Sequence, residues 1–298
     1  MTHNKCCRRG ANLRRRRRRR RKILRSIIFS CSIIAVAVFV AVGSSMIRSG
    51  DGRTNRYDVE AGNNTYDNAV IENSKISEKN KIQNNQSMLD DIMNSTQYPK
   101  QLKDLALKNE EALEFVYDYP AEHVKEHTID LTEEASMDSV PLFVQWDKRW
   151  GYEKYSGNFF AASGCGPTTL SMVVVYLTHN REASPIAVAK YSKEAGYSVD
   201  GSGSSWTLIS EGCMHYGVKA KAVALDESRM KAELDEGHPI VVNVGPGDFT
   251  DTGHFMVITG YDDEGFSIND PNSIEKSGKR WLFKNISSQI RAVWSMYV

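Results

Sequence analysis

A cysteine stands where a helix is predicted to begin, in the stretch from Ser163 to Leu177 that reads SGCGPTTLSMVVVYL. Pro167 suits a first helical turn because its missing N–H is not needed there, and apolar residues recur at helical spacing from Leu170 onwards. The dipole and the unpaired N–H groups of a helix N-terminus lower a thiol pKa and favour the nucleophilic thiolate. The pattern therefore indicates Cys165 as a nucleophile, with a small buried packing residue as the alternative.

A base and an orienting group follow downstream. His254 opens an apolar strand predicted over 254–260, a polar turn spans 262–265, and a second strand is predicted over 266–269 with Asp270 at its end. A cysteine on a helix, a histidine on a strand and an acid or amide on the next strand supply a nucleophile, a base and an orienter. His254 would accept the thiol proton, and a carboxylate on its other ring nitrogen would stabilise the imidazolium.

The strand register decides which residue orients the histidine, because side chains alternate between the two faces of a sheet. A hairpin loop of odd length pairs Met256 with Asp270 and places Asp270 beside His254. A loop of even length pairs Val257 with Asp270, turns that carboxylate away and makes Asn269 the orienter. We predict the odd register and Asp270.

These motifs together resemble those of the C-thirty-nine-like cysteine peptidases of bacteria, in the papain clan and related to the bacteriocin-processing peptidases. The resemblance covers roughly residues 98–298. The matching pieces, in chain order, are Gln145-Trp146-Asp147, Gly164-Cys165-Gly166-Pro167-Thr168, Gly253-His254-Phe255 and Asn269-Asp270-Pro271.

The resemblance implies a papain-like fold with Cys165 as nucleophile, His254 as base and Asp270 as third member. It also implies that Gln145 lines the oxyanion hole beside the Cys165 backbone N–H, where a neutral amide donor would stabilise developing negative charge. In papain the glutamine lies a few residues before the cysteine, whereas here the separation is 20 residues. The alternative for Gln145 is an ordinary polar residue at a strand end.

The elements that must position these residues form two groups along the chain. The first half of the domain is mainly helical, with helical patterns over 102–116, from Cys165 onwards and over 185–195, and an extended segment over 140–147. The last third reads as strands at 239–244, 254–260, 266–269 and 292–298. Helices followed by strands predict an α+β domain, over residues 96–298, with a helical part packed on an antiparallel sheet.

Three segments precede that domain. Residues 1–25 form a basic tail with an unbroken arginine run at 14–21, and the uncharged stretch 26–47 is long enough to cross a bilayer as a helix. Residues 48–95 are polar and predict a flexible stalk. The pattern predicts a single-pass membrane protein with a cytoplasmic N-terminus and an extracellular domain, which the resemblance implies to be at a bacterial cell surface. The alternative is a signal peptide cleaved near Gly43 and a secreted protein.

The leading hypothesis is a membrane-anchored extracytoplasmic cysteine peptidase acting on a peptide or protein substrate. The five cysteines have no zinc-binding spacing, so neither a metal nor a cofactor is predicted. The arginine run beside an apolar span favours membrane anchoring over nucleic-acid binding. The alternatives are a cell-wall peptide amidase or transpeptidase, a catalytically idle binding module, and a disulfide between Cys165 and Cys213.

Overall fold

The last two thirds of the chain fold around one antiparallel sheet. The computed structural model describes the backbone of residues 63–298 and the side chains of residues 77–298. The predicted basic tail, membrane span and Gly43 cleavage site therefore lie outside the described residues. Among residues 63–298, no helix combines the length and apolar character that a membrane crossing requires.

The sheet has six strands in the order β5-β10-β6-β7-β8-β9, and each neighbouring pair is antiparallel. The strands are β5 (Lys219–Ala222), β6 (Ile240–Val244), β7 (His254–Asp262), β8 (Gly265–Asn269), β9 (Arg280–Trp281) and β10 (Ile290–Tyr297). Two short hairpins, β1 (Lys154–Tyr155) with β2 (Asn158–Phe159) and β3 (Ser198–Val199) with β4 (Gly203–Ser204), lie apart from it. The predicted α+β class with an antiparallel sheet is confirmed.

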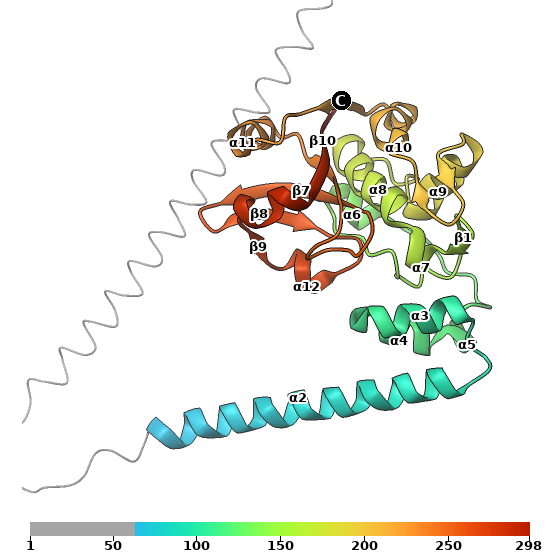
Figure 1. Cartoon of the computed structure of the whole chain (residues 1–298), viewed down its shortest axis with the longest axis vertical. Coiled ribbons are helices and arrows are strands. Elements are labelled where there is room, and N and C mark those ends of the chain that lie inside the picture. The colour runs from blue at the N-terminus through green and yellow to red at the C-terminus, as the bar shows by residue number, and fades with distance from the viewer. Residues whose placement is uncertain (1–62) are drawn as a thin grey trace, which may run out of the picture. The chain divides into compact units, whose positions relative to one another are not determined.

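Helices cover both faces of this sheet (Figure 1). The helices and turns are α2 (Asn63–Asn94), α3 (Lys100–Lys108), η1 (Glu110–Ala112), α4 (Leu113–Tyr117), α5 (Tyr119–Glu122), α6 (Thr132–Ser136), α7 (Phe160–Ser163), α8 (Cys165–Thr178), α9 (Pro185–Glu194), α10 (Thr207–Ser210), η2 (Gly212–Tyr216), α11 (Glu227–Asp235), α12 (Ile274–Ser277), α13 (Phe283–Ile286) and η3 (Ser287–Gln289).

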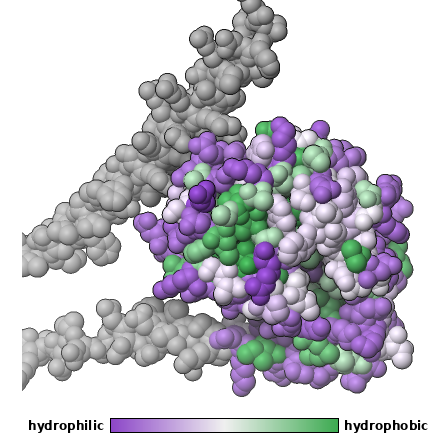
Figure 2. Space-filling view, turned by 45° about the horizontal axis from the view of Figure 1, so that its top comes forward, coloured by the Kyte–Doolittle hydropathy of each residue, from purple (hydrophilic) through white to green (hydrophobic). Residues whose placement is uncertain are grey.

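Strand alternation divides the core into two layers. Val241, Val257 and Trp294 face α8 and α9 in the larger cluster, whereas Met256 and its neighbours on the other face pack with Met230 of α11. The central strands are therefore buried on both sides, and α8 lies directly against β7. The surface shown in Figure 2 is mainly hydrophilic or neutral, with a hydrophobic area bordered by hydrophilic side chains and further hydrophobic areas elsewhere.

A third hydrophobic cluster packs the helices α2, α3 and α4 against residues just before Cys165. Ile92, Leu102 and Val116 are fully buried there together with Ala161, which belongs to α7 and precedes Cys165. Part of the predicted stalk is thus helical as α2, which contains neither proline nor glycine and buries Ile92 near its end.

The helix predicted over 102–116 is interrupted at position 109. The Asn109 backbone is extended there, and its side-chain oxygen accepts a hydrogen bond from the Glu111 N–H at 3.0 Å. This side chain therefore ends α3 and begins η1, because an asparagine can satisfy backbone donors outside a helix.

Candidate active site

Cys165 is the first residue of α8 and is partly buried. One turn later, the Thr169 hydroxyl donates a hydrogen bond to the Phe255 carbonyl at 3.1 Å, which fixes the start of α8 against β7 beside His254. Gly166 is required next to the cysteine, because a Cβ there would lie 2.6 Å from the Ser204 Oγ. The helix start is thus held between β7 and the β4 hairpin.

The environment of Cys165 favours its thiolate. Burial opposes the charged form, but a hydrogen bond with His254, the charge of that histidine, and the backbone N–H groups of Phe255 and Gly166 outweigh burial. The pKa of the Cys165 thiol is consequently lowered from its ordinary value. The same factors distinguish nucleophilic cysteines from inert buried ones.

His254 and Asp270 form a buried pair. The His254 Nε2 lies 2.7 Å from the Asp270 Oδ1, and their exposed fractions are 6% and 0%. Burial alone would lower the pKa of His254, but the charge and hydrogen bond of Asp270 and the contact with Cys165 raise it above its ordinary value. Since Nε2 is occupied by Asp270, Nδ1 is left to exchange a proton with the thiol.

A β-bulge sets the register that brings this pair together. Asp262 pairs with Gly265, so the turn contains two residues, and the predicted odd-length loop is wrong. The register shifts by one residue between Ile258 and Gly260, after which Val257 pairs with Asn269. The next position opposite Asp270 is therefore that of Met256, as in the odd register. An extra residue in one strand, and not the loop, moves Asp270 to the face of His254.

The other candidate orienter, Asn269, has a different partner. Its side-chain NH2 donates to the carbonyls of Val140 and Pro141 at 3.1 and 3.0 Å. Asn269 therefore ties the segment before Gln145 to the end of β8. Its amide is engaged there, and the carboxylate that bonds the His254 ring is that of Asp270.

Gln145 is buried beside the loop that follows Asp270. Its backbone N–H donates to the Pro271 carbonyl at 2.7 Å, and its side-chain NH2 donates to the Ala161 carbonyl at 2.7 Å and the Asn272 Oδ1 at 3.3 Å. The Gln145 Oε1 is buried without a partner among the described residues. The structure thus places Gln145 beside the active-site loop. Its side-chain NH2 is hydrogen-bonded to Ala161 and Asn272.

Sequence reasoning missed Asn272. Its backbone N–H donates to the Asp270 Oδ1 at 2.8 Å, the oxygen that also bonds His254, while the Asp270 Oδ2 is buried and unpaired within the described structure. The Asn269-Asp270-Pro271 motif ends one residue before Asn272. The signal that points further is the Asp-Pro-Asn-Ser sequence, because an aspartate side chain commonly accepts the N–H two residues on.

The two cysteines beyond residue 47 are both free, so the alternative disulfide between Cys165 and Cys213 is wrong. Cys213 is buried in the core, where burial raises its pKa to about 11. In the described part of the chain, no group of three or more histidine, cysteine or acidic side chains is placed to hold a metal ion.

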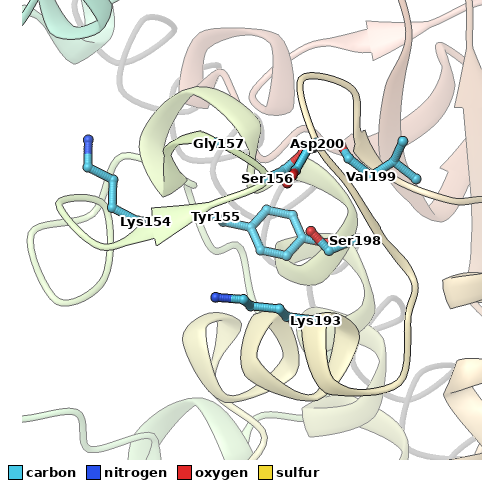
Figure 3. Close-up of a pocket in the computed structure, with 8 residues that line it drawn as sticks. All are labelled: Lys154, Tyr155, Ser156, Gly157, Lys193, Ser198, Val199 and Asp200. Carbon is cyan, nitrogen blue, oxygen red and sulfur yellow. Dashed lines mark hydrogen bonds between the residues drawn. The ribbon is translucent and has the colours of Figure 1, made fainter.

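A cavity of 440 Å³ opens beside the β1 hairpin, where Figure 3 shows the Lys193 side chain extending below the Tyr155 ring and Lys154 pointing away. The Tyr155 hydroxyl bonds the Ser204 Oγ at 2.6 Å, and Ser204 lies against Gly166. Neither Cys165 nor His254 lines this cavity. It adjoins the active-site helix through Tyr155 and Ser204.

The model of a family described as "Peptidase_C39 like family" matches residues 137–298. The peptidase domain of Streptococcus ComA, a bi-functional ABC transporter involved in quorum sensing, is 19% identical, with a TM-score of 0.38 over 53% of this chain and 96% of that one. A putative C39-like peptidase from Bacillus anthracis is 16% identical, with a TM-score of 0.34 over 53% and 95%. No curated protein matches.

Proposed function

From the premise that the chain belongs to the Peptidase_C39 like family, we propose that it is a cysteine peptidase with Cys165, His254 and Asp270 as its catalytic residues. One observation carries the proposal. A thiol with a lowered pKa at a helix start contacts a histidine whose other ring nitrogen lies 2.7 Å from a buried carboxylate. This arrangement supplies a nucleophile, a proton carrier and an orienting charge.

The chemistry follows from the two shifted pKa values. A lowered thiol pKa and a raised imidazole pKa both favour a thiolate–imidazolium pair of Cys165 and His254. The thiolate attacks the peptide carbonyl carbon, and the imidazolium gives its proton to the departing amine as the C–N bond breaks. The neutral imidazole then takes a proton from water, which attacks the thioester and releases the acid. Asp270 holds the ring and stabilises its charged form throughout.

The oxyanion of each tetrahedral intermediate needs hydrogen-bond donors. We assign this role to the Cys165 backbone N–H and the Gln145 side chain. The weaker of the two Gln145 bonds, at 3.3 Å to Asn272, is the one that would be exchanged for the oxyanion. The bond to the Ala161 carbonyl, at 2.7 Å, would keep the amide in place.

We further propose that residues 26–47 anchor the peptidase domain outside the cell. An uncharged stretch of this length next to the arginine run 14–21 has the charge asymmetry of an N-terminal cytoplasmic anchor. The domain would then meet peptides and proteins at the outer face of the membrane.

A peptide probe with a thiol-reactive group tests the enzymatic proposal. The full chain and a Cys213→Ala control should be labelled at Cys165. At neutral pH, Cys165→Ser should not be labelled at that position, and His254→Ala should be labelled there much more slowly than the parent. Cleavage of a peptide library by the full chain, absent in Cys165→Ser, would define the preferred sequence. A chain that binds peptides but is neither labelled nor cleaves them would instead be a binding module.

A further inference from the structure

A helical segment outside the matched family region forms hydrogen bonds with the loop that carries Asp270. The segment comprises α3, η1 and α4, whereas the family match begins at residue 137. Two of its side chains, Asn109 and Glu111, form hydrogen bonds with the loop and with the start of α12. The loop itself, residues 270–273, links β8 to α12.

Glu111 holds the far end of the loop. Its carboxylate accepts hydrogen bonds from the Ser273 hydroxyl and from the backbone N–H groups of Ile274 and Glu275, the latter two at 2.7 and 3.1 Å. Unpaired N–H groups at a helix start need acceptors, which usually come from the residue just before the helix. Here Ser273 and the distant Glu111 share that task for α12.

Asn109 holds the middle of the loop. Its side-chain NH2 donates to the Asn272 carbonyl at 2.9 Å and to the Asn272 Oδ1 at 3.1 Å. The Asn272 N–H in turn donates to the Asp270 Oδ1, the oxygen that bonds His254. A continuous path of hydrogen bonds therefore runs from the helical segment to the histidine.

The helical segment is itself firmly fixed. Its apolar side chains Leu102, Leu113 and Val116 are buried, and the Phe115 ring stacks on Tyr152 at a centroid distance of 4.2 Å. The Tyr152 hydroxyl also donates to the Phe115 carbonyl at 2.8 Å. A support of this kind can transmit position because packed interiors deform little.

We propose that Asn109 and Glu111 are positioning residues of the active site, which keep Asp270 aimed at His254. The inference rests on the proposed cysteine-peptidase function. Asp270 needs such support because its Oδ2 is buried without a partner among residues 77–298, so Oδ1 alone fixes its orientation toward the histidine. If the loop relaxes, the carboxylate can rotate, the imidazolium loses stabilisation and the Cys165 thiolate becomes less populated. The helical segment is then part of the catalytic unit.

The test compares two adjacent glutamates in the full chain. Glu111→Ala removes one acceptor contact with the loop and two with the start of α12, whereas Glu110→Ala, the matched control, removes an exposed contact with Asn85 at 2.7 Å. Iodoacetamide labelling of Cys165 is followed by mass spectrometry from pH 5 to pH 9. We expect Glu111→Ala to slow labelling at pH 6 by about tenfold, which corresponds to about 1.4 kcal/mol, and to move the rise of the rate to higher pH because the thiolate is the form that reacts. Glu110→Ala should match the parent.

Two further measurements separate positioning from folding. Hydrogen exchange of the peptide covering 270–277 should speed up in Glu111→Ala while the exchange of β7 is unchanged. Glu111→Gln, which keeps one carbonyl acceptor, should give a labelling rate between those of the parent and Glu111→Ala, and it replaces that variant if Glu111→Ala does not fold.

The outcomes distinguish the two proposals. A parent with an activated Cys165 and a Glu111 variant whose pH profile equals that of Glu110→Ala overturns the positioning role and leaves the peptidase proposal standing. A lower melting temperature with an unchanged pH profile also overturns it, because that result shows only a structural role. A parent in which Cys165 reacts like an ordinary thiol refutes the peptidase function, and the positioning role with it.

Discussion

Replacing Asp270 with asparagine should affect chemistry far more than folding. Two unit charges about 4 Å apart attract by about 4 kcal/mol at an effective dielectric constant of about 20. Loss of the Asp270 charge should therefore lower turnover, and the Cys165 thiolate population, by up to about a thousandfold. Asparagine keeps an oxygen for the Asn272 N–H but puts an NH2 where Oδ2 has no partner in the described structure. That cost, about 1–3 kcal/mol, is partly offset because a buried charge is removed.

Asn269→Ala is the matched control, because we expect it to affect folding far more than chemistry. It leaves the carbonyls of Val140 and Pro141 without the donor they now share, so it should lower the free energy of unfolding by about 1–3 kcal/mol while leaving His254 untouched. The assays are thermal unfolding and the pH dependence of Cys165 alkylation, with turnover once a substrate peptide is known. The reasoning is refuted if Asn269→Ala slows alkylation more than Asp270→Asn does.

Three further predictions concern other parts of the chain. Gln145→Ala should lower peptide turnover by about a hundredfold or more but leave Cys165 alkylation nearly unchanged, because alkylation forms no oxyanion; equal effects on both rates would contradict the assignment. The pKa of Glu233 is lowered from 4.5 to about 2, chiefly by its hydrogen bond with His238. The ionised Glu233 therefore stabilises the folded state fully above pH 4.5, and this stabilisation is lost as the pH falls toward 2. Glu233→Gln should thus lower the free energy of unfolding by up to about 3 kcal/mol at pH 7 and by little at pH 2. The same loss at both pH values would argue against stabilisation by the Glu233 charge. Protease added to intact cells should remove residues 48–298 and spare the N-terminal tail; protection would reverse the orientation, and a soluble form beginning near Ser44 would indicate signal cleavage.

Local sequence patterns were sufficient for much of the fold. The apolar periodicity after Cys165 corresponds to α8, and the alternating strands after residue 239 correspond to β6, β7, β8 and β10. These features depend on residues close in sequence, where the period of apolar positions determines which face is buried. The identification of the family from four short motifs rested on the same local information and is confirmed.

The contacts that orient the active-site residues could not be predicted from local sequence patterns. Thr259 carries no signal that marks it as the point where the β7 register shifts, because a bulge depends on how two strands pack. The bonds from Asn109 to the loop and from Glu111 to the start of α12 join positions more than 160 residues apart. Asn109 lies in a segment read as a continuous helix, so its role as a break and as a donor to Asn272 emerged only from the structure.

The alkylation rate of Cys165 near pH 7 tests the central claim most directly. Cys213 serves as the internal reference, because a pKa of about 11 leaves only about one molecule in ten thousand as thiolate at that pH. We predict that iodoacetamide modifies Cys165 at least about a hundredfold faster than Cys213 and faster than free cysteine below pH 7. His254→Ala should reduce the Cys165 rate at that pH to no more than that of free cysteine. A Cys165 rate that is ordinary in the parent, or unchanged in His254→Ala, would contradict an activated cysteine nucleophile.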